Sequence, residues 1–386
     1  MLTIEKIIHA QRVLEEAIFK TDVVRTSNFI DGYELYLKAE NLQKTGSFKI
    51  RGAYYKISRL SDEEKKRGVI ACSAGNHAQG VALAAQKNGI PALICLPDGA
   101  PISKVEATRS YGAELCLVPG VYDDAYERAL QLQKERQLTF IHPFDDEDVI
   151  AGQGTIGLEI LSQLKDLDAI VVPVGGGGLI SGVAFAVKSM NPKVQVYGVQ
   201  ASGAASMVTS LHDHKIECLP SVSTIADGIA VKQPGEHTFD YCNRFVDGIV
   251  TVTDEEISAA ILALIEKRKM IAEGAGATPV AAIMAGKLPQ LKGKKVCCVV
   301  SGGNIDVTIL QCTLNIELLD KPGQLVAVSQ IIAKCGANVV GVHHEHANAG
   351  SEVIGCYLRI DMETRNFEHI QEIRRALSEA GFKICD

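Results

Sequence analysis

A chain of 386 residues is long enough for two or three domains with a sizeable core. Its 47% of hydrophobic and 22% of charged residues are typical of a soluble globular protein, and its net charge of −7, with no long basic run, argues against a nucleic-acid partner. The charged N-terminal segment argues against a signal peptide, and no apolar stretch reaches the about 18 residues of a membrane span, so no membrane partner is expected.

The pattern from residue 34 to residue 300 alternates apolar strands with helices. Strands are predicted at 34–40, 69–72, 92–96, 114–117, 169–174, 194–200 and 295–300, and helices at 78–87, 103–111, 154–164 and 179–190, with a further helix after Ser47. This alternation favours parallel sheets covered on both faces. In such folds ligands bind beyond the carboxyl ends of the strands.

The pattern changes after residue 311. Residues 312–386 read as strand, helix, strand, strand, helix and strand, with strands at 313–318, 337–345, 352–359 and 382–385 and helices at 324–335 and 366–379. That order predicts a small ferredoxin-like α+β domain.

The eleven cysteines are dispersed, which fits free thiols in a reducing cytoplasm. The one adjacent pair, Cys297 and Cys298, lies in a predicted apolar strand. Alternate strand residues face opposite sides, so this pair is expected to pack in the core and not to bind a metal.

Lys49 is the first candidate for chemistry. Ser47 is predicted to cap the helix that follows, which places Lys49 in the first turn. The positive end of the helix dipole disfavours a second positive charge there, and a partly neutral lysine can form a Schiff base with an aldehyde. An ordinary surface lysine is the alternative.

A glycine loop follows the strand at 169–174. Its residues are Gly175, Gly176, Gly177 and Gly178. Backbone N–H groups of such a loop, at the start of a helix, can converge on one anion. A P-loop would need Lys after the last glycine, where Leu179 stands, and a dinucleotide fingerprint would need Gly where Ser181 stands. A single phosphate is therefore the favoured ligand, with a plain tight turn as the alternative.

Two further loops occupy strand ends. The segment from Ser73 to His77 joins a strand to a helix and offers free N–H groups beside Ser and Asn side chains, which suits a carboxylate. A simple helix cap is the alternative, and His77 is expected to contribute its backbone and not to act as a base. Residues 301–304, beginning at Ser301, follow the strand at 295–300, and their position supports one shared site.

Seven segments in chain order carry a family resemblance: KTGSFKIRGA, SAGNHAQG, AGQGTIG, VGGGGLISG, TIADG, EGAGA and VSGGNID. Together they resemble the pyridoxal-phosphate enzymes of the tryptophan-synthase-β fold type (fold type II), and among these the threonine ammonia-lyases, or threonine dehydratases. The resemblance covers about residues 1–310. The remaining residues resemble an ACT domain, with LLDKPGQL as its strand–helix turn.

The resemblance implies an α/β catalytic domain over residues 1–311, built of two parallel-sheet subdomains with the smaller at about 45–145, and an ACT regulatory domain over residues 312–386. It implies pyridoxal 5'-phosphate as cofactor. Lys49 would hold this cofactor and later take the substrate α-proton, Phe48 would lie against the ring, Asn76 would bond the ring hydroxyl and Ser301 would meet the ring nitrogen. The loop from Gly175 to Gly178 would hold the phosphate.

The substrate carboxylate would be received by Ser73, Gly75, Asn76 and His77. The implied reaction is β-elimination and deamination of L-threonine to 2-oxobutanoate and ammonia, with a side activity on L-serine, and the cofactor phosphate would serve as the acid for the leaving hydroxyl. A neutral Ser301 at the ring nitrogen suits prompt elimination over transamination. Glu273 and Asp227 are further candidates, with a helix cap or a turn as the alternative for each.

Serine racemase, which can also dehydrate serine, shares this scaffold and is the main rival. Racemisation needs a second proton donor, and the racemases carry serine where this chain has Ala74. Their divalent-cation site would fall at Gln200, Ala204 and Ser206, where this chain has no carboxylate, so no tight divalent site is expected. Cysteine synthase ranks lower because its asparagine loop differs, a Rossmann dehydrogenase is disfavoured by Ser181, and a non-enzymatic amino-acid sensor is disfavoured by Lys49.

Regulation is expected at the C-terminal domain. Asp320 and Gly323 lie in a turn before a helix whose N–H groups can take an amino-acid carboxylate, and the resemblance suggests isoleucine or valine. An edge strand of this domain invites pairing between subunits, so a homodimer or homotetramer is expected. His343, His344 and His346 are not expected to bind a metal, because only two of them share a strand face.

Overall fold

The computed structural model describes residues 1–26, 29–305, 311–319, 321–346, 355–364 and 367–385. The chain divides into two compact units, Met1–Ile305 and Asp306–Asp386. In the described residues no helix combines the length and the apolar character needed to cross a membrane.

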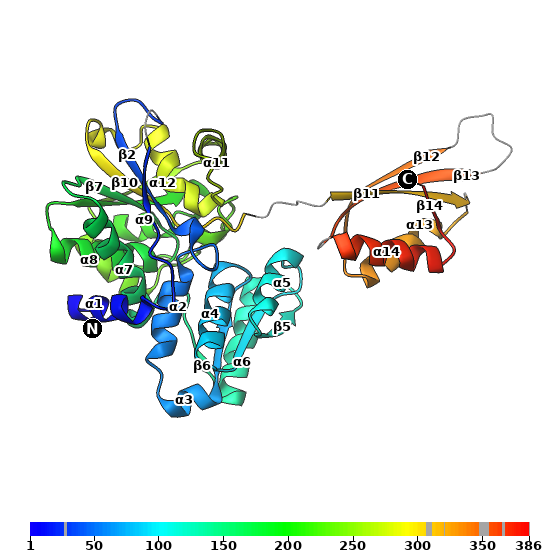
Figure 1. The fold of residues 1–386 in the computed structure, drawn as a ribbon, viewed down its shortest axis with the longest axis horizontal. Coiled ribbons are helices and arrows are strands. Elements are labelled where there is room, and N and C mark those ends of the chain that lie inside the picture. Colours follow the sequence, from blue (N-terminus) through cyan, green and yellow to red (C-terminus); the bar gives the residue numbers. More distant parts are fainter. Residues whose placement is uncertain (27–28, 306–310, 320, 347–354, 365–366, 386) are drawn as a thin grey trace. The chain divides into compact units, whose positions relative to one another are not determined.

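The larger sheet of the first unit has six strands in the order β1-β2-β10-β7-β8-β9 (Figure 1). They are β1 (Val23–Thr26), β2 (Glu34–Ala39), β10 (Lys295–Val300), β7 (Ala169–Pro173), β8 (Gln195–Ala201) and β9 (Gly248–Val252). All neighbours pair in parallel except β1, which runs antiparallel to β2 at one edge. The predicted parallel sheet is thus confirmed, with two edge strands that were not predicted, the antiparallel β1 and the parallel β9.

Helices cover both faces of this sheet. They are α1 (Ile4–Leu14), α7 (Glu147–Gln163), α8 (Gly178–Met190), α9 (Ser206–His212), α10 (Glu236–Phe245), α11 (Asp254–Arg268) and α12 (Gly274–Met284). One core cluster joins α11 and α12 to the strands and contains Cys298, and another joins α7, α8 and α10 to them and contains Cys297. The adjacent cysteines therefore pack on opposite faces, as the alternation of a strand predicts.

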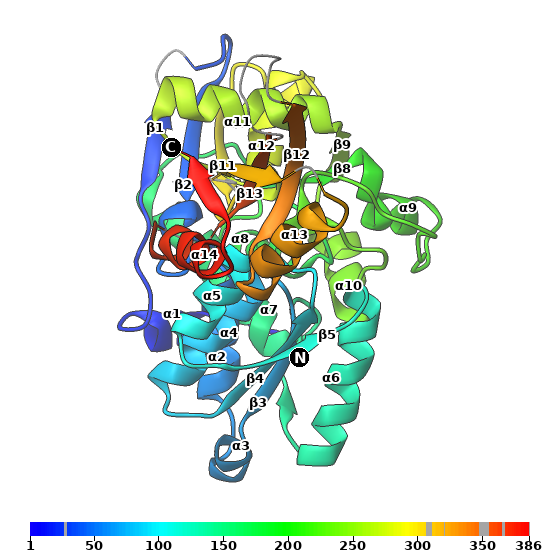
Figure 2. The same cartoon turned by 90° about the vertical axis from the view of Figure 1, so that its right-hand side faces the viewer.

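The smaller sheet has four parallel strands in the order β5-β4-β3-β6. They are β5 (Glu114–Val118), β4 (Ala92–Pro97), β3 (Val69–Cys72) and β6 (Thr139–Phe140). Figure 2 shows α6 (Tyr122–Arg136) lying along β3 and β4, where Ala125, Ala129 and Leu132 pack against the strands. The opposite face is covered by α2 (Lys49–Ser58) and α4 (Asn76–Lys87), while α3 (Asp62–Arg67) and α5 (Ile102–Ser110) complete this subdomain.

The C-terminal unit has the predicted ferredoxin-like order of elements. These are β11 (Gln311–Leu319), α13 (Gln324–Lys334), β12 (Asn338–His346), β13 (Gly355–Glu363), α14 (Phe367–Glu379) and β14 (Lys383–Cys385). The strands form one antiparallel sheet in the order β12-β13-β11-β14. Its core is separate from that of the first unit and includes Ile316, Ile332, Ile360 and Ile373.

Candidate active site

Lys49 is the first residue of α2, as the sequence predicts, but Ser47 is not the cap of this helix. The cap position is taken by Phe48, without a side-chain bond to the helix, and Ser47 Oγ is buried with no hydrogen-bond partner among the described residues. Ser47 instead forms a backbone bridge with Gly302, and the N–H of Phe48 donates to the carbonyl of Ser301 at 3.0 Å. Pairing with this distant loop holds Ser47 outside the helix.

The amine of Lys49 lies in an environment that favours its neutral form. Its Nζ donates to the carbonyl oxygen of Pro143 at 2.8 Å and lies 5.3 Å from the centre of the Phe48 ring. Burial lowers the pKa of Lys49 to about 8, although the negative charge of Glu273 opposes the shift. Burial is therefore the leading cause of the lowered pKa.

The glycine loop lies at the carboxyl end of β7, and α8 begins at its last residue, Gly178. None of the four N–H groups from Gly175 to Gly178 donates to a backbone or side-chain acceptor within the described ranges. A side chain on Gly178 would meet the carbonyl oxygen of Phe144 at 2.8 Å, and Gly177 has φ +96°. The loop therefore requires glycine and presents a set of free donors to an anion.

The loop from Ser73 to His77 lies at the carboxyl end of β3 and opens α4 at Asn76. Ser73 Oγ accepts from the N–H of Gly75 at 3.2 Å, which leaves the N–H groups of the first helical turn directed outward. The buried ring of His77 donates through Nε2 to the carbonyl of Ile141 at 2.8 Å, and burial lowers its pKa to about 3. This ring is neutral at physiological pH, and its Nε2 is held by the hydrogen bond to Ile141.

Hydrogen bonds join the third loop, residues 301–304, to the segment that carries Lys49 and to the loop from Ser73 to His77. The N–H of Gly303 donates to the carbonyl of Gly46 at 2.9 Å, next to the segment that carries Lys49. Asn304 Nδ2 donates to Asn76 Oδ1 at 2.7 Å. Since β10 pairs directly with β7, the loop that begins at Ser301 also neighbours the glycine loop.

Glu273 and Asp227 both lie at this site. Glu273 precedes α12 but makes no capping bond, and its side chain, only 4% exposed, accepts from Asn76 Nδ2 at 2.7 Å. Burial, followed by the charge of Asp227, raises the pKa of Glu273 to about 7. Asp227 accepts from the N–H of Gly228 at 2.8 Å, as a turn carboxylate does, and also pairs with Lys104 at 2.5 Å.

Two features were missed by the sequence reasoning. Lys104 lies in α5, and its Cδ would be 4.0 Å from a Cβ built on Gly75. The only sequence signal for its presence at the site is that α5 follows the carboxyl end of β4. The second is a cluster beneath α2, in which the fully buried Arg51 bonds Glu40 at 2.7 and 2.8 Å and Glu159 at 2.7 and 2.9 Å. Lys38 adds a bond to Glu159 at 2.6 Å.

The positions matching the racemase cation site are engaged within the protein. Gln200 donates to the carbonyl of Ala204 at 3.2 Å and accepts from the N–H of Val208 at 2.9 Å, while Ser206 Oγ donates to the carbonyl of Val231 at 2.8 Å. These bonds stabilise the chain after β8 without a cation.

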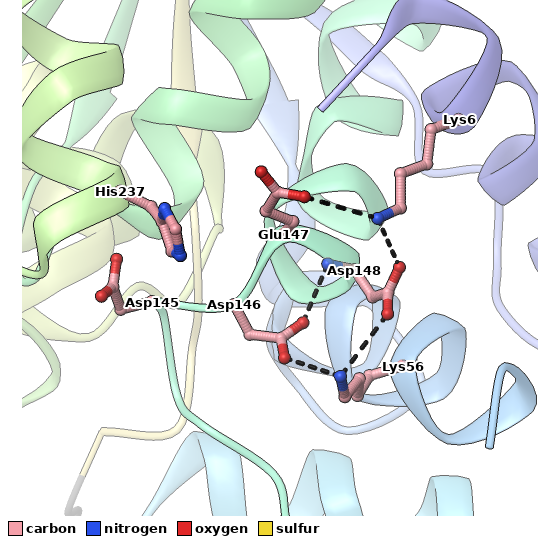
Figure 3. A pocket seen from close by; sticks show the side chains of 7 residues that line it. All are labelled: Lys6, Lys56, Asp145, Asp146, Glu147, Asp148 and His237. Atoms are coloured by element: carbon pink, nitrogen blue, oxygen red, sulfur yellow. Dashed lines mark hydrogen bonds and ion pairs between the residues drawn. The ribbon is translucent and has the colours of Figure 1, made fainter. Parts of the chain in front are cut away.

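A separate open pocket of about 420 Å³ is lined by Lys6, Lys56, Asp145, Asp146, Glu147, Asp148 and His237 (Figure 3). Its carboxylates are largely neutralised, since Lys6 pairs with Asp148 and Lys56 with Asp146, both at 2.7 Å. Asp145 accepts from the N–H of Thr238 at 3.1 Å, and Thr238 Oγ1 donates to the carbonyl of Gly176 at 2.6 Å. The pocket contains none of the predicted site residues. Its Asp145 holds Thr238, which is in turn bonded to the glycine loop.

The candidate effector turn lies in the other unit. Gly323 has φ +90° and precedes α13, and a side chain built on it would meet no described atom within 4 Å. Asp320 lies outside the described residues. Among the described residues no group of His, Cys, Asp or Glu has the arrangement of a metal site, His343 and His344 included.

Comparison with known proteins gives consistent matches. The family model described as "Pyridoxal-phosphate dependent enzyme" matches residues 14–302. The L-threonine ammonia-lyase of Thermotoga maritima is 49% identical over 399 residues, covering 100% of this chain and 99% of the relative. Processed threonine deaminase isoform 2 of Solanum lycopersicum has a TM-score of 0.76 at 40% identity, over 79% of this chain and 90% of its own. Maize serine racemase has a TM-score of 0.77 at 37% identity, over 79% and 94%.

Proposed function

The chain belongs to the pyridoxal-phosphate dependent enzymes, and we propose that it is a lyase that converts L-threonine to 2-oxobutanoate and ammonia with the cofactor held on Lys49. When bound, pyridoxal 5'-phosphate supplies a sink for the electrons released when a bond at the substrate Cα breaks. The observation that carries the proposal is the buried amine of Lys49, with its pKa lowered to about 8. This amine donates to the carbonyl of Pro143, and the next residue, Phe144, packs against the loop of four free N–H donors at Gly178.

The residues present fit this cofactor. The N–H groups from Gly175 to Gly178 match a phosphate in charge and in their lack of other acceptors. Phe48 lies beside the Lys49 amine and would face the ring, and Asn76 and Ser301 would meet the ring hydroxyl and the ring nitrogen. Ser301 is neutral, so it would stabilise a charged ring nitrogen less than a carboxylate would.

The substrate carboxylate would bind at the start of α4, at the N–H groups of Asn76 and His77, beside Ser73 and Gly75, which bond each other. Lys49 Nζ, once released from the cofactor, would take the proton from the substrate Cα. The Lys104–Asp227 ion pair adjoins Gly75 and would restrict access to the bound carboxylate.

Threonine and serine turnover test this function. We expect the purified enzyme to convert L-threonine to 2-oxobutanoate, and L-serine less efficiently to pyruvate, with negligible D-serine, because the methyl group of Ala74 cannot transfer a proton. Ala74→Ser is expected to raise D-serine formation by about a hundredfold, the effect of one positioned acid–base group. A chelator should leave turnover largely intact, since Gln200 and Ser206 are engaged within the protein.

Substantial D-serine from the unmodified enzyme would contradict the assignment as an ammonia-lyase and favour a racemase. A strong loss of activity with chelator would instead contradict the expectation that residues 200–206 form no tight divalent-cation site. Absence of keto acid from either substrate, in protein that carries the cofactor, would exclude the proposed reaction.

We further propose that the C-terminal unit is an ACT domain, which pairs between subunits of a homodimer or homotetramer and binds an amino-acid effector near Gly323. The uncrowded, left-handed Gly323 before α13 and the separate core of this unit support the proposal. A structural dimerisation domain is the alternative. Nine of the eleven cysteines have described side chains, and these nine form no disulfide, which suits a cytoplasmic enzyme.

Removal of residues 313–386 is expected to abolish any response to isoleucine or valine and to reduce the size of the assembly. Effector coupling of about 1–3 kcal/mol corresponds to a change of about 5–150-fold in apparent affinity, which kinetic titration can detect. The measurements are threonine saturation curves with and without each amino acid, and mass in solution. A truncated enzyme with the same assembly and the same responses would refute the regulatory role.

A further inference from the structure

A chain of hydrogen bonds crosses the candidate site from a backbone carbonyl to a carboxyl group. Asn304 Nδ2 donates to the carbonyl oxygen of Thr45 and to Asn76 Oδ1, each at 2.7 Å. Asn76 Nδ2 in turn donates to Glu273 Oε1 at 2.7 Å. The four groups come from four separate segments of the chain, and two of these segments carry loops that the proposed function assigns to the cofactor.

The polarity of this chain is fixed at its first member. The two ends of an amide side chain have similar shapes, so bonding partners decide which end faces which way. A backbone carbonyl can only accept, so the atom of Asn304 that faces Thr45 must be Nδ2. The same Nδ2 faces Asn76, whose contacting atom must then be Oδ1, and this orientation turns Asn76 Nδ2 toward Glu273.

Close packing keeps both ends of the chain in place. A side chain on Gly302 would collide with Glu273 Oε1, and a side chain on Gly46 would collide with Asn304 Oδ1. Glu273 is 4% exposed and is surrounded by the charges of Lys49, Lys104 and Asp227. Protonation of Glu273 does not reverse the polarity, because the carbonyl oxygen of a protonated carboxyl group still accepts.

We propose that Asn304 and Glu273 are positioning residues, which hold the Asn76 amide so that its remaining N–H is directed to the cofactor ring oxygen. This inference rests on the proposed function, in which Asn76 meets that oxygen. A group that can only donate stabilises the ionised ring oxygen over the protonated one. The protein thereby sets the charge state of the bound cofactor through a residue, Asn304, that need not touch it.

The test measures the pH at which the visible absorbance of the enzyme-bound cofactor changes. Asn304→Asp replaces the double donor with an acceptor of the same shape, so the Asn76 amide is free to turn its oxygen to the ring. We expect the midpoint of the absorbance titration to shift upward by about one pH unit. The neutral Asn304→Ala is expected to shift it in the same direction by a smaller amount.

Asn41→Asp is the matched control. Asn41 is 7% exposed and also donates to a backbone carbonyl, that of Ile271 at 2.9 Å, but it is not bonded to Asn76. This variant introduces the same chemical change at a residue bonded to Ile271, which stands two positions before Glu273 in the chain. Its absorbance titration is expected to match that of the wild type. Equal shifts in Asn41→Asp and Asn304→Asp would overturn the inference, because a general charge effect would then explain both.

Neutron diffraction from the perdeuterated wild-type holoenzyme gives the same answer without a variant. Two deuterons are expected on the Asn76 atom that faces Glu273 and the cofactor, and none on the atom that faces Asn304. The opposite assignment, or an unshifted titration in both Asn304 variants, would refute the positioning role. Failure of the wild type to retain cofactor on Lys49 would instead refute the proposed function, so the two failures are distinguishable.

Discussion

Lys49→Ala is expected to lower turnover of L-threonine by about 10⁴-fold or more, because the change removes both the covalent attachment point and the acid–base group at the substrate Cα. The variant should also lose the absorbance of the bound cofactor. Borohydride reduction of the wild-type holoenzyme, followed by peptide mapping, should place the label on the peptide that contains Lys49.

Lys44→Ala is the control for this experiment. Lys44 lies five residues upstream, with its amine 5.1 Å from the Phe19 ring, and it is not among the site residues. This variant should retain both the label on Lys49 and the activity. A label on another lysine of the wild-type protein would contradict the assignment.

The lowered pKa of Lys49 adds a pH dependence to the same prediction. Only the neutral amine attacks an aldehyde, so attachment of pyridoxal phosphate to the cofactor-free protein should accelerate as the pH rises and level off above about 8. Below that pH the rate should fall about tenfold per unit. Stopped-flow absorbance between pH 6 and 9 at about 0.5-unit steps would measure the profile, and a rate that still rises about tenfold per unit up to pH 9 would show that burial does not activate this amine.

Local sequence signals predicted seven strands of the first unit and the three loops at strand ends, but missed β1, β6 and β9. Strand β3 is fully buried, as its run of apolar residues predicts. The glycines after β7 stand between a strand and a helix, and this local order is enough to predict an anion-binding loop. The start of α7 was predicted several residues too late, because the glycines at 152 and 154 weaken a helical pattern. Asp146 caps this helix by accepting from the N–H groups of Asp148 and Val149, a signal that was present in the sequence.

Long-range contacts account for what the sequence could not reveal. Ser47 has the composition of a cap, yet its bridge to Gly302 prevents that role. Glu273 and Asn304 face Asn76 because the segment before α12 and the loop after β10 meet the loop after β3. Lys104 reaches Asp227 from the other subdomain. The buried partners of Arg51 come from the end of β2 and from α7, and no local motif links these segments.

Arg51→Met is expected to lower the free energy of unfolding by about 3–5 kcal/mol, which is the usual cost of removing one partner from a buried ion pair. Arg51 is fully buried and donates four bonds of 2.7–2.9 Å to Glu40 and Glu159. Its removal leaves Glu40 buried without a bonded cation. Lys38 does not replace Arg51 there, because, of these two carboxylates, it is bonded to Glu159. Because Arg51 lies two residues after Lys49, we also expect weaker cofactor binding in the variant.

Arg109→Met is the matched control, since Arg109 forms a surface pair with Glu106 at 2.6 Å and both side chains are at least 40% exposed. This change should cost about 0–1 kcal/mol. Urea denaturation of the three proteins at neutral pH measures the difference. Equal stability of the two variants would show that the cluster beneath α2 does not hold the helix that carries Lys49.

The pH dependence of the Arg51→Met effect provides a second and independent check. Burial alone would raise the pKa of Glu40, but the charge and hydrogen bonds of Arg51 outweigh it and hold the pKa below its ordinary value. A carboxyl group with a lowered pKa stabilises the native state above its unfolded pKa and loses that contribution as the pH falls through the native value. In the variant Glu40 can take up a proton instead, so the stability difference between wild type and variant should shrink as the pH is lowered below about 4.5. A difference that stays constant as the pH is lowered further, below about 4.5, would mean that lost packing of the arginine side chain, and not the unpaired carboxylate, accounts for the destabilisation.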